Sequence, residues 1–198
     1  MSDARTFLEI DTDKELEAMM NRLATLQQSL GAPSLLKNAL NAAARKVQKE
    51  LIKSVKEEYA LTDQTGLKSQ SEGKPQVRNA SNSSLTATIL SRGPMQDIMR
   101  YMTQPNTETA AAAAQVLNEG SLKPLEVGSI KAFAEKLPTG HVAIMQRKGK
   151  ARLPIKKLLS PAIPMAMGSE SVTEPVQAQA YELMQAEIAK RIDKLLER

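Results

Sequence analysis

The sequence predicts an α+β protein in which an antiparallel β-sheet or meander packs against a long helix of the N-terminal half and a C-terminal helix. Two long segments repeat apolar residues every three or four positions, as one face of an amphipathic helix does. Between them, short segments of β-type residues are separated by turn-forming residues, as antiparallel strands are. A chain of 198 residues can bury one core of this kind, so we expect a single domain over residues 1–198.

The N-terminal third predicts a helical region over residues 12–60. A short strand over residues 6–10 precedes it, and Thr12 and Glu15 have the spacing of a capping box. A longer second helix is predicted from residue 34 to residue 59. Its apolar residues form one stripe: Leu36, Leu40, Ala43, Val47, Leu51, Val55 and Tyr59. Packing on the protein's own sheet explains this stripe better than a coiled coil does.

The middle of the chain predicts two weakly anchored segments and a hairpin. Residues 62–75 are rich in turn formers and lack apolar periodicity, which predicts a loop. Residues 76–80 and 85–91 alternate like the strands of a hairpin, and residues 95–102 then fit a short helix. Residues 106–120 contain five consecutive alanines, which predicts a helical insertion. Because the loop and the insertion have little apolar surface, we expect both to be loosely ordered in the free protein.

A basic β-meander is predicted over residues 130–167, with turns at Pro138-Thr139-Gly140 and at Lys148-Gly149-Lys150. Two prolines near its end predict an extended segment over residues 160–167. A last helix is predicted over residues 173–196. The residues of its expected buried stripe are Val176, Leu183, Met184, Ile188, Ile192, Leu195 and Leu196.

Positive charge gathers in this meander. Residues 121–168 hold nine Lys and Arg against two Glu, while the rest of the chain is nearly neutral. Because these cations lack aromatic neighbours, they favour contacts to phosphates or to an acidic surface over the reading of bases. The alternative is a solvated hairpin whose charges maintain solubility. The predicted contacts to nucleic acid or to an acidic partner are Arg147, Lys148, Lys150, Arg152, Lys156 and Lys157.

The sequence lacks the residues on which most catalytic and metal sites depend. It has no Cys and a single His, which excludes a Cys-based zinc site and a His-rich metal site. That residue, His141, is better explained as a turn residue bonded to backbone than as a general base, because it has no visible partner. No Gly-rich phosphate loop and no apolar stretch of membrane-spanning length is present. We therefore predict a protein that is not an enzyme, with no cofactor, metal, small-molecule substrate or membrane partner.

The meander also carries a family resemblance. In order along the chain it contains Phe133, Gly140, His141, Arg147, Pro154, Ile155, Pro161 and Pro164. This run, with the helix that follows it, resembles the minor tail protein Z family of lambda-like bacteriophages and prophages, part of the wider tail-completion group. The helix ending near Tyr59 and the segment Thr86-Ala87-Thr88-Ile89 are similar as well. The first helix and the alanine-rich segment depart from the family pattern.

The resemblance implies a structural, non-enzymatic protein of the virion tail, built as one tail-completion-like domain. Its expected place is the head-proximal end of the tail, where it acts in tail completion and head-tail joining after assembly in the host bacterial cytoplasm. The expected partners are further copies of the chain in a ring, other tail or connector proteins, and packaged DNA. The residues alone leave open an alternative, a cytoplasmic protein that binds nucleic acid independently of sequence through the basic hairpin.

Overall fold

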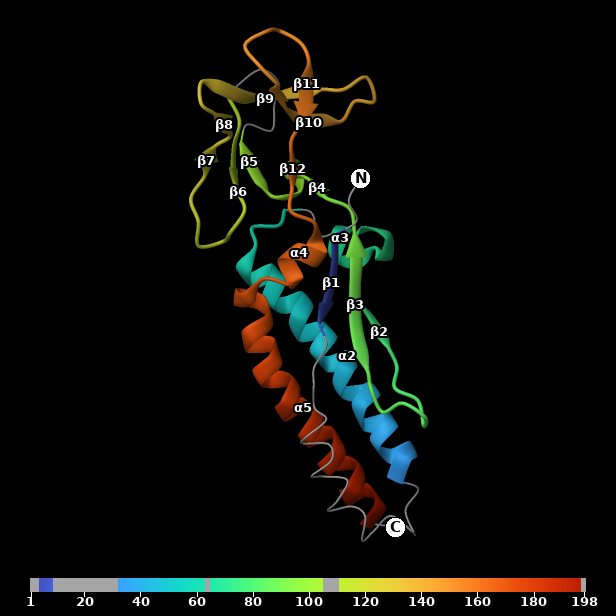
Figure 1. Ribbon diagram of the computed structural model, residues 1–198. Helices are drawn as coiled ribbons and strands as arrows, with labels where there is room; N and C mark the ends of the chain where they lie inside the picture. The colour runs from blue at the N-terminus through green and yellow to red at the C-terminus, as the bar shows by residue number, and fades with distance from the viewer. Residues whose placement is uncertain (1–3, 9–31, 63–64, 105–110, 197–198) are drawn as a thin grey trace. The chain divides into compact units, whose positions relative to one another are not determined.

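The computed structural model describes residues 4–8, 32–62, 65–104 and 111–196 (Figure 1). Within these residues, α-helices combine with antiparallel sheets, which confirms the predicted α+β class. The described chain forms two compact units, and the expectation of a single domain over residues 1–198 stays a prediction. The sheet unit is defined here by residues 4–5, 55–62, 65–74, 92–104 and 111–166, and the helix unit by residues 6–8, 32–54, 75–91 and 167–196.

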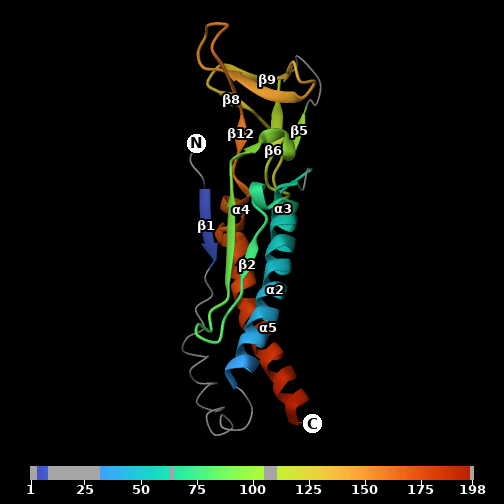
Figure 2. The same cartoon turned by 90° about the vertical axis from the view of Figure 1, so that its right-hand side faces the viewer.

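The helix unit is organised around two long helices, α2 (Ala32–Glu58) and α5 (Glu170–Leu196), which run side by side (Figure 1, Figure 2). Both lie within three residues of their predicted bounds. The predicted stripe of α2 is buried as far as Val55. On α5 the buried apolar residues recur every four positions: Val172, Val176, Ala180, Met184 and Ile188. Val172 and Ala180 lie outside the predicted stripe, and Leu183 of that stripe is only half-buried.

A hairpin packs on these helices through Ala80, Leu85 and Ala87. Its strands, β2 (Gln76–Arg78) and β3 (Thr88–Gly93), pair antiparallel, as the alternation of residues predicts. The side chain of Asn41 on α2 holds it in place, since Asn41 Nδ2 donates to the Ala80 carbonyl at 3.2 Å and Asn41 Oδ1 accepts from the Ala80 amide at 2.7 Å. The strand expected over residues 6–10 is β1 (Ala4–Leu8), beside β3. The helix expected to follow it lies outside the described residues.

The loop predicted over residues 62–75 is wrong where the structure describes it. Residues 65–72 form α3 (Thr65–Lys68) and the 3-10 turn η1 (Gln70–Glu72). A Cβ atom added at Gly66 or at Gly73 would lie 2.7 or 2.6 Å from the side chain of Ile163, and Gly73 has a φ of 133°. The glycines that suggested a flexible loop therefore permit close packing instead.

The helix predicted over residues 106–120 is also wrong for residues 111–120, and residues 106–110 lie outside the described chain. The alanine run instead contributes β6 (Ala113–Gln115), the middle strand between β5 (Met102–Gln104) and β7 (Lys123–Pro124). Helix propensity is a weak preference, and here pairing on both sides and a close-packed core outweigh it. Small side chains make that core dense: Ala112, Ala114, Ala132 and Ala134 are buried beside Ile98 and Ile144.

The short helix expected over residues 95–102 reduces to a single 3-10 turn, η2 (Ile98–Arg100). Asp97 caps this turn, because its carboxylate accepts a hydrogen bond from the Met99 amide at 3.0 Å. On either side the chain is extended, as β4 (Gln96–Asp97) and β5. The turn therefore connects two sheets, because β4 pairs with β12 and β5 pairs with β6.

The meander has the strand order β11-β10-β9-β8 and is antiparallel throughout. Its strands are β8 (Glu126–Val127), β9 (Ile130–Lys136), β10 (Val142–Arg147) and β11 (Ile155–Lys157). The extended segment predicted over residues 160–167 is wrong beyond β12 (Leu159–Ser160), which pairs with β4. The chain turns there into α4 (Ile163–Met167), and Pro164 lies in its first turn, where the missing amide proton has no helical partner to lose.

Candidate functional site

The hairpin formed by β10, β11 and the loop between them carries all six predicted contact residues, three in the loop and three at the strands that flank it. Arg147 stands opposite Ile155 in the register of the two strands. The Lys148 amide donates to the Pro154 carbonyl at 3.0 Å, which closes the base of the loop. We call residues 147–157 the basic loop.

Two of the six cations are held by the protein itself. The Arg147 guanidinium donates to the Arg152 carbonyl across the loop and lies 5.6 Å from the centre of the Phe133 ring, within cation–π range. Lys157 Nζ lies 2.7 Å from Asp97 Oδ2. These two residues therefore shape and anchor the loop.

The other four cations, Lys148, Lys150, Arg152 and Lys156, have exposed side chains. Within the described part of the chain, none of the four forms an ion pair. The sequence itself has no Asp or Glu between Lys136 and Ser169, so the chain directly before and after these four cations carries no negative side chain. The loop therefore presents a concentrated positive field that an anionic partner can neutralise.

His141, at the start of β10, has a carboxylate partner, and the expected bonding to backbone alone is wrong for its side chain. Its Nε2 lies 2.9 Å from Asp97 Oδ2. The turn before it closes through the Gly140 amide, which donates to the Leu137 carbonyl at 2.8 Å, and Gly140 has a φ of 82°. This geometry aims the His141 ring at the strand pair formed by β4 and β12.

Asp97 is the shared acceptor of this arrangement, and its side chain is 11% exposed. Burial alone raises the pKa of Asp97, but hydrogen bonds from Lys157, His141 and the Met99 amide outweigh it and hold that pKa below its ordinary value. The carboxylate therefore stays ionised near neutral pH, where it fixes Lys157 at one end of the basic loop.

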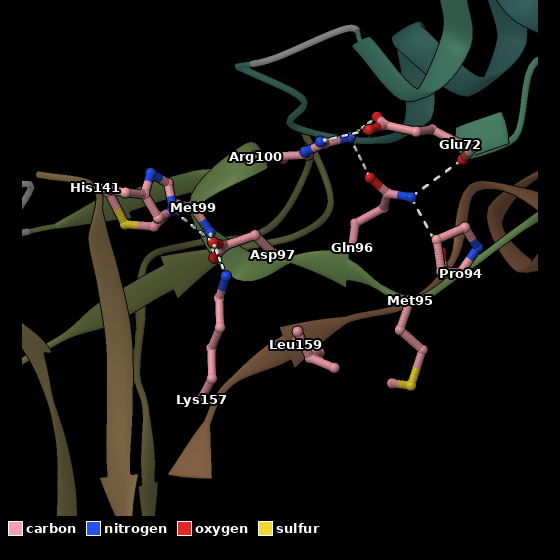
Figure 3. A pocket seen from close by; sticks show the side chains of 10 residues that line it. All are labelled: Glu72, Pro94, Met95, Gln96, Asp97, Met99, Arg100, His141, Lys157 and Leu159. Carbon is pink, nitrogen blue, oxygen red and sulfur yellow. Dashed lines mark hydrogen bonds and ion pairs between the residues drawn. The ribbon is translucent and has the colours of Figure 1, made fainter. Parts of the chain in front are cut away.

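Asp97, His141 and Lys157 form one wall of a surface cavity of about 410 Å³ (Figure 3). Met95 and Leu159 form an apolar part of its lining. Each acidic or basic side chain in the lining has a protein partner: Glu72, Asp97, Arg100, His141 and Lys157. The acidic and basic groups of this lining are therefore paired with one another.

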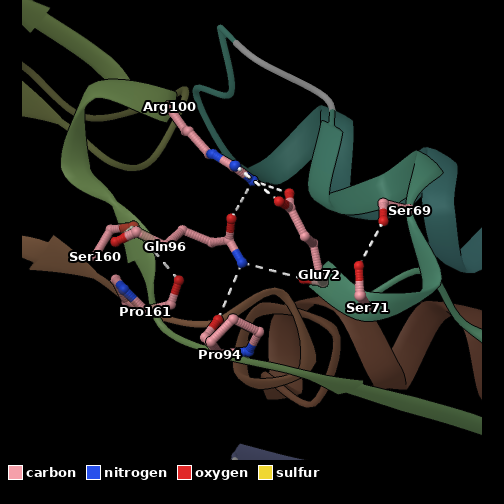
Figure 4. A network of polar contacts seen from close by, with 8 residues as sticks. All are labelled: Ser69, Ser71, Glu72, Pro94, Gln96, Arg100, Ser160 and Pro161. Atoms are coloured by element: carbon pink, nitrogen blue, oxygen red, sulfur yellow. Dashed lines mark hydrogen bonds and ion pairs between the residues drawn. The ribbon is translucent and has the colours of Figure 1, made fainter. Parts of the chain in front are cut away.

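A polar network stabilises the cavity wall on the side of η1 (Figure 4). The buried Gln96 side chain donates to the carbonyls of Glu72 and Pro94 at 3.1 and 3.0 Å. The Arg100 guanidinium binds the Glu72 carboxylate through both terminal nitrogens and also contacts Gln96. Ser160 Oγ donates to the Gln96 carbonyl at 3.4 Å. Because each polar side chain is satisfied, the network rigidifies the wall.

The residues that carried the family resemblance frame the basic loop and the connection after it. Phe133 supports Arg147, and the Pro154 carbonyl closes the loop base. The Pro161 carbonyl accepts a hydrogen bond from the Tyr101 hydroxyl at 3.5 Å, and Pro164 is buried in α4. Most of the motif therefore has an architectural role around one exposed loop.

Among the residues that the structure describes, no group of three or more His, Asp or Glu side chains could hold a metal ion. The helices that the structure describes include none that is long and apolar enough to cross a membrane.

Comparison with known proteins places the chain in a family. Residues 14–198 match the family model described as prophage minor tail protein Z (GPZ), a span that includes the basic loop and most of both units. No curated protein and no solved structure matches the chain. The family implies a structural role in the phage tail, contact with other tail proteins and a location in the tail of the virion. The agreement between this match and the resemblance of residues 133–164 shows that the chain belongs to the prophage minor tail protein Z family.

Proposed function

We propose that this protein completes the phage tail at its head-proximal end and takes part in joining the tail to the DNA-filled head, as one subunit of a ring. A closed ring repeats one contact between neighbouring copies by rotation. Each subunit then presents the same loop to the next layer of the particle, so a modest contact is multiplied around the ring.

The observation that carries this proposal is the basic loop. Lys148, Lys150, Arg152 and Lys156 are exposed on a loop whose shape is fixed by hydrogen bonds at its base and across its width. Joining two preassembled structures depends on diffusional encounter, and complementary charge raises the rate of such encounters. A fixed loop also loses little conformational entropy on contact.

Electron microscopy of lysates tests this role. A phage or prophage with the gene deleted should release full heads beside unjoined tails, and the wild-type gene supplied in trans should restore joined particles. The quadruple variant Lys148→Gln, Lys150→Gln, Arg152→Gln and Lys156→Gln should fold normally and yield about tenfold fewer infectious particles or less. Arg147 and Lys157 stay unchanged because they shape the loop.

A matched control removes the same charge from another surface. Arg45, Lys49, Lys190 and Lys194 are exposed on α2 and α5, and their replacement by Gln should restore joining as the wild type does. Normal infectious particles from the deletion would refute the role in joining. Equal titres from the two quadruple variants would show that the basic loop has no specific part in joining.

The same four cations support the alternative function, binding of nucleic acid independently of sequence. Four phosphate contacts predict that the logarithm of the binding constant falls with the logarithm of salt concentration with a slope of about −3.6. Filter binding of the purified protein to duplex DNA across a salt series measures this slope. A slope of that size, together with normal particles from the deletion, would favour the alternative.

A further inference from the structure

An apolar side chain projects from the middle of the basic loop. Leu153 is 68% exposed, and it follows Arg152 directly in the chain. Single exposed leucines are common on protein surfaces and need no explanation by themselves. Two further observations give this leucine significance.

The first is that the loop holds Leu153 in its exposed position from both sides. The Arg152 carbonyl, just before it, accepts from the Arg147 guanidinium. The Pro154 carbonyl, just after it, accepts from the Lys148 amide at 3.0 Å. Leu153 therefore lies between two anchored residues, and a partner that covers it immobilises little additional chain.

The second is the distribution of apolar and charged surface over the described residues. All of the large apolar side chains with high exposure belong to the sheet unit: Met95, Met102, Leu117, Val127, Leu153, Leu159 and Met165. The described sheet unit has 15 Lys and Arg against 7 Asp and Glu, whereas the described helix unit has 9 against 6. Exposed apolar groups combined with excess charge of one sign favour contact with a complementary protein.

We propose that the basic loop docks on an acidic surface of a neighbouring tail protein, with Leu153 inserted into an apolar recess of that surface. Lys148, Lys150, Arg152 and Lys156 then face carboxylates around the recess. Protein interfaces concentrate their affinity in a buried apolar or aromatic anchor within a polar rim. A phosphate backbone needs donors and positive charge, and it offers Leu153 nothing to cover it. This inference rests on the proposed function, because it names the chemistry of the partner that the joining role requires.

The test separates the leucine from the charges. Purified full-length protein is bound to purified tails from the deletion phage and, separately, to a short DNA duplex. Leu153→Ser should weaken binding to the tails about tenfold or more and leave binding to the duplex unchanged. Leu153→Met should retain binding to the tails. The matched control Val127→Ser changes a side chain of similar exposure, 66%, in the same unit and should bind tails as the wild type does.

Two results would overturn the proposal. One is binding of Leu153→Ser to the tails with wild-type affinity. The other is loss of duplex binding by Leu153→Ser, which would indicate that the leucine contacts DNA. Wild-type protein added to separate heads and tails distinguishes this failure from that of the proposed function. If the wild-type protein restores joining and Leu153→Ser restores joining equally well, only the docking inference fails. If the wild-type protein does not restore joining, the joining role fails.

Discussion

Glu187 on α5 is a carboxylate whose side chain is 8% exposed inside the helix unit. Lys46 Nζ on α2 lies 2.7 Å from its Oε1, and the Arg191 guanidinium one turn further along α5 contacts its Oε2. Hydrogen bonds from Lys46 and Arg191 outweigh the effect of burial and lower the pKa of Glu187 to about 2 from an ordinary value of 4.5. One carboxylate therefore links the two long helices.

This shift predicts how stability depends on pH. Because the folded-state pKa is lowered, the contribution of Glu187 to stability is present above pH 4.5 and is lost as the pH falls from 4.5 towards 2. Glu187→Gln should cost about 2 kcal/mol of the free energy of unfolding near neutral pH and flatten the loss of stability in that acidic window. Thermal unfolding followed by circular dichroism over this pH range measures both effects. Glu182→Gln, at an exposed position of α5, is the control and should match the wild type.

Single residues also show how much of the candidate site can be predicted from the sequence. The six cations and the glycine turn at Gly140 follow from local composition and turn chemistry. The partners of His141 and Lys157 do not, because Asp97 lies 44 and 60 positions away in the sequence and carries no motif. Arg147 likewise looked like a contact residue, although its guanidinium is engaged with Phe133 and with the loop backbone. Charge is visible in a sequence, whereas the pairing of charges depends on the fold.

At the scale of single elements, prediction succeeds where the pattern is local and long. The stripe of α2 is buried from Leu36 to Val55, as its regular spacing predicts. The alanine run misleads because its own propensity favours a helix while its neighbours favour a strand. β6 is paired on both sides, by β5 and β7, which come just before and just after it in the chain but lie outside the alanine run itself. The segment around Gly66 and Gly73 misleads in a similar way, since close packing against Ile163 leaves no trace in the local pattern.

The strand assignment of the alanine run predicts an alternating response to larger side chains. Ala114 is buried in the core of the sheet unit, whereas Ala113 on the same strand is half-buried and points to the other face. Ala114→Leu should cost about 1–3 kcal/mol of the free energy of unfolding, because a close-packed core has no room for the added atoms. Ala113→Leu should cost clearly less. Urea denaturation measures the two values, and equal costs at both positions would contradict the alternation.

At the scale of the whole chain, the fold class and the family follow from the sequence, while the division into two units does not. Each unit combines segments from several distant parts of the chain, so no composition shift marks a boundary between them. Charge follows the same division, since the excess of Lys and Arg over Asp and Glu among the described residues is larger in the sheet unit. The basic loop accounts for six of that unit's cations. This asymmetry suits a protein that binds its partner through one unit.

The distribution of charge predicts how joining responds to salt. The distance over which charges act falls from about 30 Å at 0.01 M salt to about 8 Å at 0.15 M, so the rate at which purified protein restores joining should fall as salt is added. The quadruple Gln variant of the basic loop should start from a lower rate and depend less on salt, while the helix control of equal charge should follow the wild type. Leu153→Ser should join less at every salt concentration yet keep the wild-type slope, because an apolar anchor slows dissociation and the cations speed encounter. Particle counts by electron microscopy give the rates. Identical salt slopes for the two quadruple variants would show that the charge acts through the net field of the protein and not through the basic loop.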